Sequence, residues 1–135
     1  MRTRTLFRIL LLFAALHFAS CNKDSEIDIN QLTGTWNVYN DDPRLSVDGF
    51  VKYTFKADES CLIYSYDALS NRDTTIYRNY IVSHDNKILT LYTQNPIYKE
   101  NRLYTEQYEI TKLTRKEMRL ECTDKSSSIK LVKSN

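Results

Sequence analysis

Residues suited to acid–base or nucleophilic chemistry are few after the apolar N-terminal stretch. His84 is the single histidine there, and it lies in the polar segment Ser83-His84-Asp85-Asn86. A Ser–His–Asp triad would need this imidazole as its base, oriented by a buried carboxylate. The segment instead has the composition of a turn, where a histidine is normally solvated. The sequence therefore predicts no catalytic residue and a protein that is not an enzyme.

Metal-binding and phosphate-binding patterns are missing from the sequence as well. Cys61 and Cys122 lie far apart and, with one histidine, provide too few ligands for a zinc site. The acidic pair at 41 and 42, beside Pro43, lacks the series of oxygen ligands of a calcium loop. The chain has only two glycines, too few for a glycine-rich phosphate loop. We therefore predict no metal and no cofactor. Whether the two cysteines form a disulfide or remain buried thiols stays open.

Residues 1–20 have the pattern of a cleavable export signal. Three arginines and no acidic residue lie within the first eight positions, and the apolar run ILLLFAALHF follows at 9–18. That run is too short to cross a bilayer, which takes about 20 apolar residues in a helix. The small residues Ala19 and Ser20 end the segment, as at a signal cleavage site. A buried N-terminal helix is the alternative, and the uncompensated arginines argue against it.

The charge of the chain changes once this signal is set aside. The whole chain has 19 basic and 17 acidic residues. Without Arg2, Arg4 and Arg8, 16 basic residues remain against 17 acidic ones. A protein that binds nucleic acid through phosphates normally has a basic stripe, and no such stripe is left. We therefore expect no nucleic-acid partner.

The segment Phe-Ala-Ser-Cys at 18–21 resembles the lipobox of bacterial lipoproteins, with Phe18 where leucine is usual. The resemblance implies that Cys21 is acylated and becomes the mature N-terminus. Acyl chains contribute about 0.8 kcal/mol per buried CH₂, so several chains anchor a protein to a membrane without a spanning helix. Ordinary secretion is the alternative.

A short polar tether, residues 21–30, follows the predicted cleavage site. Its start, CNKDSE, resembles the sequence after the cysteine in lipoproteins of Bacteroidetes that reach the outer face of the outer membrane. The resemblance implies an outer-membrane, lipid-anchored protein that is displayed at the cell surface. A plain solvated spacer on the periplasmic side is the alternative.

The remaining chain, 31–135, has the length of one domain and the pattern of successive strands. Runs rich in Tyr, Val, Ile, Thr and Leu are bounded by Asn, Asp, Ser, Gly or Pro, and helical periodicity is nowhere sustained. The predicted strands are 34–40, 50–58, 61–67, 74–82, 87–94, 102–113, 116–123 and 128–133.

Several of these runs alternate apolar and polar residues, which indicates sheet with one buried face. In 117–122, Met118, Leu120 and Cys122 share one face, and in 51–56 Val51 and Phe55 do the same. Eight short strands in meander order favour an antiparallel up-and-down β-barrel, because closure removes exposed edges. The sequence therefore predicts an all-β, eight-stranded antiparallel barrel.

The segment LTGTW at 32–36 resembles the Gly-x-Trp signature at the first strand of lipocalins, through Gly34 and Trp36. The segment 108–122 resembles the penultimate hairpin of lipocalin-like domains in Bacteroidetes lipoproteins. The resemblance implies a lipocalin-like barrel over 31–135 in which Trp36 closes the base. The chain lacks the Thr-Asp-Tyr motif and the C-terminal helix of true lipocalins, which argues against a deep calyx.

Tyrosine is the residue type in surplus, with ten copies, all after the signal. Tyrosine suits strands, so packing alone is one explanation. The other is a stacking surface at a barrel mouth, with some of these rings facing inward, for a small hydrophobic or amphipathic ligand or a glycan. The candidate ligand-binding residues are Tyr64, Tyr66, Tyr77, Tyr80 and Tyr92. We therefore expect a non-enzymatic binding lipoprotein, or alternatively an interaction or inhibitor lipoprotein that acts through its loops.

Overall fold

The computed structural model describes residues 27–41, 48–94 and 102–135. The predicted signal peptide at 1–20, the predicted lipidation site Cys21 and Asp42 of the acidic pair lie outside the described residues. Among the described residues, no helix is long and apolar enough to cross a membrane.

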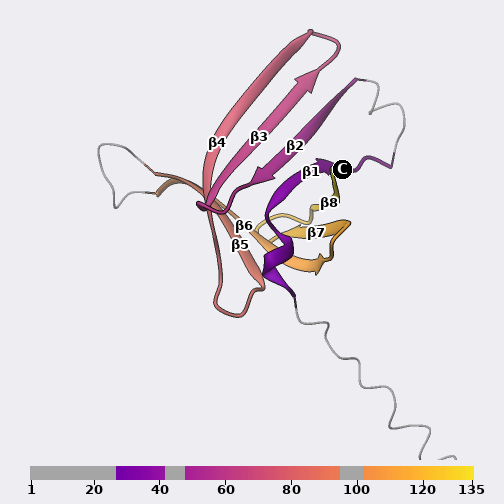
Figure 1. Ribbon diagram of the computed structural model, residues 1–135. Coiled ribbons are helices and arrows are strands. Elements are labelled where there is room, and N and C mark those ends of the chain that lie inside the picture. The colour runs from indigo at the N-terminus through magenta and orange to yellow at the C-terminus, as the bar shows by residue number, and fades with distance from the viewer. Residues whose placement is uncertain (1–26, 42–47, 95–101) are drawn as a thin grey trace, which may run out of the picture.

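Eight antiparallel strands follow one another in chain order around a closed barrel (Figure 1). The last strand pairs with the first and closes the sheet. This confirms the predicted all-β, up-and-down topology. A short 3₁₀ helix, η1 (Ile29–Gln31), precedes the strands, which are β1 (Gly34–Val38), β2 (Gly49–Phe55), β3 (Ser60–Asp67), β4 (Arg72–Val82), β5 (Ile88–Gln94), β6 (Arg102–Leu113), β7 (Glu117–Cys122) and β8 (Ser128–Lys133).

The largest difference from the predicted boundaries concerns the strand expected at 50–58, which ends at Phe55. The chain turns here because Glu59 has a positive φ of 63° and its N–H donates to the Lys56 carbonyl oxygen. The Asp58 carboxylate accepts from the N–H and the hydroxyl of Ser60. A side chain that bonds to nearby backbone in this way favours turns over strands.

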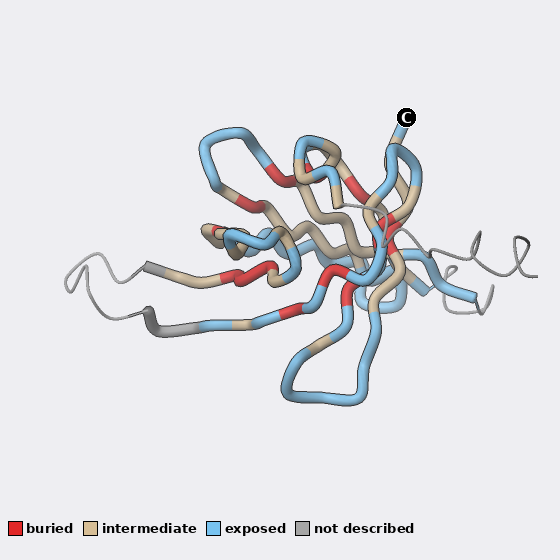
Figure 2. Tube along the Cα trace, turned by 90° about the horizontal axis from the view of Figure 1, so that it is seen from below, coloured by how far each residue is buried: buried red, intermediate tan, exposed pale blue. Residues whose placement is uncertain are grey.

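The hydrophobic core occupies the end of the barrel next to η1. Residues at alternate positions of the strands are buried there, and Figure 2 shows these buried residues spread over several strands. Ile27 and Ile29 pack against this core. The core consists of Leu32, Trp36, Phe55, Cys61, Tyr80, Leu89, Leu91, Tyr108, Ile110, Met118, Leu120 and Leu131. We call this end of the barrel the closed end.

Trp36 forms the floor of the closed end. Its side chain is fully buried, and its Nε1–H donates to the Leu32 carbonyl oxygen at 2.8 Å. Lys133, its neighbour on β8, places Nζ 4.2 Å from the ring centroid. That Nζ also donates to the carbonyl oxygens of Gln31 and Thr33. The end of the last strand thus fastens η1 across the floor.

Strands β2, β3 and β4 extend beyond the barrel at the opposite, open end (Figure 1). β4 pairs with β5 only from Asn79 to Val82, although it pairs with β3 from Arg72 to Asn79. Gly49 opens β2 at this end with φ +155°, and its backbone lies so close to β3 that a Cβ would approach the Tyr66 carbonyl oxygen to 2.1 Å. Only glycine fits such a contact.

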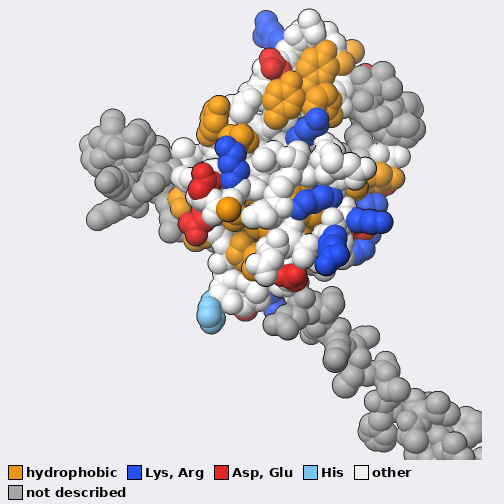
Figure 3. Space-filling view, in the orientation of Figure 1, with side chains coloured by type: hydrophobic (Ala, Val, Ile, Leu, Met, Phe, Trp, Pro, Cys, Tyr) orange, Lys and Arg blue, Asp and Glu red, His pale blue; other side chains and the backbone are white. Residues whose placement is uncertain are grey.

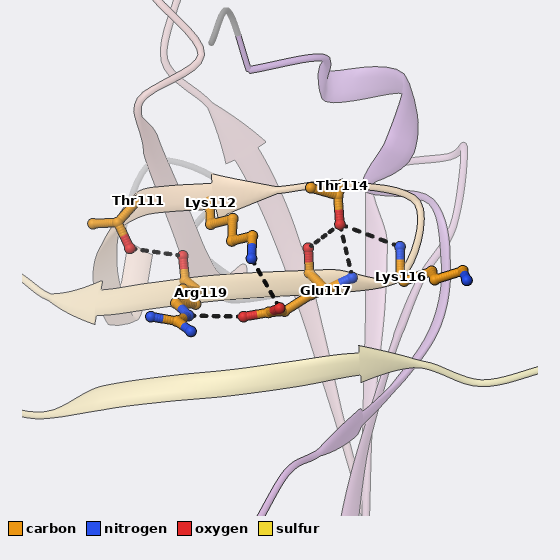
Figure 4. A network of polar contacts seen from close by, with 6 residues as sticks. All are labelled: Thr111, Lys112, Thr114, Lys116, Glu117 and Arg119. Carbon is orange, nitrogen blue, oxygen red and sulfur yellow. Dashed lines mark hydrogen bonds and ion pairs between the residues drawn. The ribbon is translucent and has the colours of Figure 1, made fainter. Parts of the chain in front are cut away.

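The β6–β7 hairpin is held by a network of polar contacts on its outer face (Figure 4). The Glu117 carboxylate accepts from Lys112 Nζ at 2.9 Å and from Arg119 Nε at 2.8 Å. The Thr114 hydroxyl accepts from the N–H groups of Lys116 and Glu117 in the turn. The hydrogen bonds to Lys112 and then Arg119 lower the pKa of Glu117 to about 2.

Candidate functional site

The structure places four of the five candidate tyrosines on the outer face of the sheet, three of them on β3 and β4. Phe55 pairs with Cys61, and both point into the core, so the residues of opposite parity point outward. Tyr64 and Tyr66 belong to that outward set. Tyr77 on β4 shares their face and is 72% exposed. By alternation, Tyr64 and Tyr66, with Tyr77 or Tyr80 on the next strand, are the rings expected to face the interior. That expectation is wrong for Tyr64, Tyr66 and Tyr77.

The other two candidates are also separated from each other. Tyr80 points inward but lies in the closed end, where its hydroxyl donates to the Lys56 carbonyl oxygen at 2.7 Å and its ring meets Phe55 edge-on. Tyr92 pairs with Asn79, which faces outward beside Tyr80 on β4. The five tyrosines do not converge on one site, and Tyr80 is a core residue.

The inward side chains of β2, β3 and β4 become less buried toward the open end. On β2, Phe55 is buried and the next inward residue toward the open end, Tyr53, is half-buried. On β3, Cys61 is buried and the next inward residue, Ile63, which pairs with Ile76 on β4, is half-buried. Ile76 faces inward and is still 37% exposed. Ile63 and Ile76 thus form an accessible apolar wall above the packed core, and Arg78, which pairs with the inward Cys61, lies between Ile76 and Tyr80 on the same face of β4.

A polar group lies on this inner face, between the core and the open end. Glu106 on β6 pairs with the buried Leu91, so its carboxylate points inward. Tyr108, two residues on, donates its hydroxyl to Glu106 Oε2 at 2.9 Å. Burial first, and then the charge of Glu106, raises the pKa of Tyr53 on β2. The same two causes, with this hydrogen bond, raise the pKa of Tyr108. Strands from opposite sides of the barrel therefore contribute to one cluster.

The sequence contained a signal for this cluster that counting tyrosines missed. Glu106, Tyr108 and Ile110 alternate with outward residues, which places a carboxylate on the apolar face of its strand. A carboxylate on such a face is unusual and often functional.

A buried hydroxyl also lies on the inner face, on β5. Thr93 alternates in step with the inward Leu89 and Leu91, and its buried Oγ1 has no hydrogen-bond partner among the described residues. Buried hydroxyls normally have such a partner.

Histidine and cysteine side chains are the other candidates for reactive groups among the described residues. His84 is exposed in the turn between β4 and β5, as expected for a solvated histidine. Cys61 and Cys122 are free thiols, and burial raises the pKa of Cys61 to about 12. The described residues hold no group of His, Cys, Asp and Glu side chains arranged to bind a metal ion. A surface depression of ≈ 460 Å³ at the closed end is lined by Leu32, Glu59 and neighbouring residues, outside the inner face.

The cluster of Tyr53, Glu106 and Tyr108 with the apolar wall of Ile63 and Ile76 is the best candidate site. It could hold a molecule with an apolar part against the wall and a hydrogen-bond donor against the carboxylate. Comparison of the chain with family models, with curated proteins and with solved structures finds no match.

Proposed function

We propose that this chain is a lipid-anchored lipoprotein of the cell envelope whose barrel binds a small amphipathic ligand at its open end. The observation that carries the binding role is the exposure of Ile76, an inward-facing apolar residue above a packed core. Ligand sites combine such apolar walls with a few convergent polar groups. Glu106 and Tyr108 supply those groups, so the ligand has an apolar body and a polar end that donates a hydrogen bond.

A lipid anchor on Cys21 would lie close to the closed end of the barrel. Cys21 lies six residues before Ile27, which packs at the closed end. Six extended residues span at most about 20 Å. An acyl anchor on Cys21 would therefore hold the closed end near the membrane and leave the open end facing away from it. The ligand would enter from the aqueous side.

Two neighbouring residues of β4 test the binding role. Ile76 points inward and Tyr77 points outward on the same strand. We expect the apolar amine N-phenyl-1-naphthylamine to gain fluorescence on binding, and Ile76→Ser to weaken its affinity about tenfold, since burial of such a side chain is worth 1.5–3 kcal/mol. The matched control Tyr77→Ser should leave the affinity within about twofold. Equal effects of both substitutions, or no binding by the wild type, would refute the inner-face site.

Cys21 tests the anchor. Cys21→Ala should release the protein into the soluble fraction and abolish incorporation of labelled palmitate, because the thioether that carries the lipid cannot form. The barrel should remain folded, since position 21 lies before Ile27, the first of the described residues to pack on the core. A variant that stays with the membranes, together with a wild type that takes up no label, would contradict the lipoprotein assignment.

Display on the outer face of the outer membrane is a separate part of the proposal. Protease added to intact cells should remove the domain. Replacement of Lys23, Asp24 and Glu26 by alanine should protect the domain, because these charged residues form the export-like sequence after the cysteine. If the wild type resists the protease on intact cells but not on broken ones, the protein faces the periplasm.

An interaction lipoprotein that acts through its loops is the second candidate. Leu69, in the turn between β3 and β4 at the tip of the projecting strands, is 82% exposed and favours it. Substitution of Leu69 would then abolish capture of a protein partner, whereas Ile76→Ser would leave it unchanged.

A further inference from the structure

Three aromatic rings lie together on the outer face of β2 and β3, and we call them the outer aromatic cluster (Phe50, Tyr64 and Tyr66); Tyr64 and Tyr66 are half-buried. The Phe50 ring centroid lies 5.7 Å from the centroids of both tyrosines, with tilts of 42° and 37°. Phe50 is 43% exposed. Figure 3 shows hydrophobic side chains gathered over this projecting part of the sheet. Exposed aromatic patches of this kind mark interaction sites.

Contacts within the protein support the rings of the outer aromatic cluster. The Tyr66 hydroxyl donates to Asn71 Oδ1 at 3.0 Å, and Asn71 itself sits in the turn with φ 50°. Phe50 is flanked by both tyrosines, and Lys52 Nζ lies 4.8 Å from its ring centroid. Such an arrangement lowers the entropy lost on binding.

Polar side chains surround the outer aromatic cluster on neighbouring strands. The register places Asp73 beside Tyr66 and Thr75 beside Tyr64, both on the outer face of β4. Lys52 lies beside Tyr64 on the other side. The margin therefore offers one carboxylate, one hydroxyl and one ammonium group around an aromatic floor, with opposite charges that offset each other.

We propose that the outer aromatic cluster binds a neutral pyranose oligosaccharide. A sugar ring has an apolar C–H face that stacks on an aromatic ring, and hydroxyl groups at its edge that need both donors and acceptors. The cluster supplies the stacking surface, and Asp73, Thr75 and Lys52 supply the hydrogen-bonding groups. The offsetting charges disfavour a strongly charged polymer. A lipid surface also fits poorly. The proposed anchor on Cys21 precedes η1, and the cluster lies at the end of β2 remote from η1 (Figure 1).

This site is independent of the ligand site inside the barrel. The outer aromatic cluster and the wall of Ile63 and Ile76 occupy opposite faces of the same strands. A ligand can therefore occupy either site without the other, and failure of one proposal leaves the other in place.

Affinity gel electrophoresis of the purified protein tests the proposal, with dextran, mannan, xylan and mixed-linkage β-glucan as soluble probes. At least one polysaccharide should retard the wild type. Phe50→Ala and Tyr64→Ala should each weaken the apparent association constant by about tenfold or more, since each removes a stacking ring. Unchanged thermal melts would establish that both variants are folded, as the exposure of Phe50 predicts.

Tyr39→Ala is the matched control. Tyr39 is an exposed ring with a lysine over it, Lys130 at 4.0 Å from the centroid, but it lies outside the outer aromatic cluster. This variant should bind as the wild type does. Absence of retardation by every probe would overturn the proposal, and so would retardation that survives both Phe50→Ala and Tyr64→Ala. A change from dimer to monomer in Phe50→Ala, seen by sedimentation, would also overturn it and make this face a contact between copies.

Discussion

Lys133 is the residue whose replacement tests the account of the closed end. Its Nζ donates to the carbonyl oxygens of Gln31 and Thr33 and lies 4.2 Å from the Trp36 ring centroid. A hydrogen bond from a charged group contributes about 1.5–3 kcal/mol, and a cation–π contact about 0.5–1 kcal/mol at an exposed site. Because Lys133 is partly solvated, we expect Lys133→Met, which keeps the apolar stem, to lower the free energy of unfolding by about 2–3 kcal/mol.

Urea denaturation followed by tryptophan fluorescence measures this loss at the site itself, because Trp36 is the only tryptophan. The fluorescence of the folded variant should also shift to longer wavelength, since η1 loses its tie to β8 and water reaches the ring. Lys130→Met is the matched control, as Lys130 lies on the same strand over the exposed Tyr39 ring. It should cost about 0.5 kcal/mol or less. Equal losses in the two variants would refute the view that Lys133 fastens the floor.

Three further predictions concern other parts of the barrel. Gly49→Ala should lower the free energy of unfolding by about 2–3 kcal/mol, because its Cβ would lie 2.1 Å from the Tyr66 carbonyl oxygen; a loss below about 0.5 kcal/mol in urea denaturation would contradict that contact. The pKa of Glu117 is lowered from its ordinary value of 4.5 to about 2 in the folded state. Its contribution to the free energy of unfolding is therefore complete above pH 4.5 and is lost as the pH falls toward 2. Thermal melts of the wild type and Glu117→Gln should therefore differ at pH 6 and converge near pH 2, and a constant difference would argue against the ion pairs. The Cys61 thiol is buried and has a pKa of about 12, so it should react with a maleimide only after unfolding. The half-buried Cys122 should react in the folded protein. Equal reaction rates of the two thiols in the folded protein would contradict the packing of the core.

The sequence alone predicted the class of fold, the number of strands and their order, because these follow from local properties. Alternation with a period of two marks a strand, and polar turn residues mark its ends. Consecutive strands joined by short turns pair as hairpins, so a meander needs no long-range information. Errors arose where a side chain redirects the chain locally, as at Asp58, whose carboxylate binds the backbone of Ser60.

The candidate site depended on tertiary structure, since alternation separates two faces of a strand without identifying the inner one. In β3 both faces carry apolar residues, with Cys61 and Ile63 on one and Tyr64 and Tyr66 on the other. Only pairing with β2, whose Phe55 lies in the core, assigns the tyrosines to the outside. The effect of the Glu106 charge on the pKa of Tyr53, and the hydrogen bond from Lys133 to Gln31, join residues far apart in the chain. Such contacts exist only after the barrel closes, because closure is what brings the first, middle and last strands around one interior.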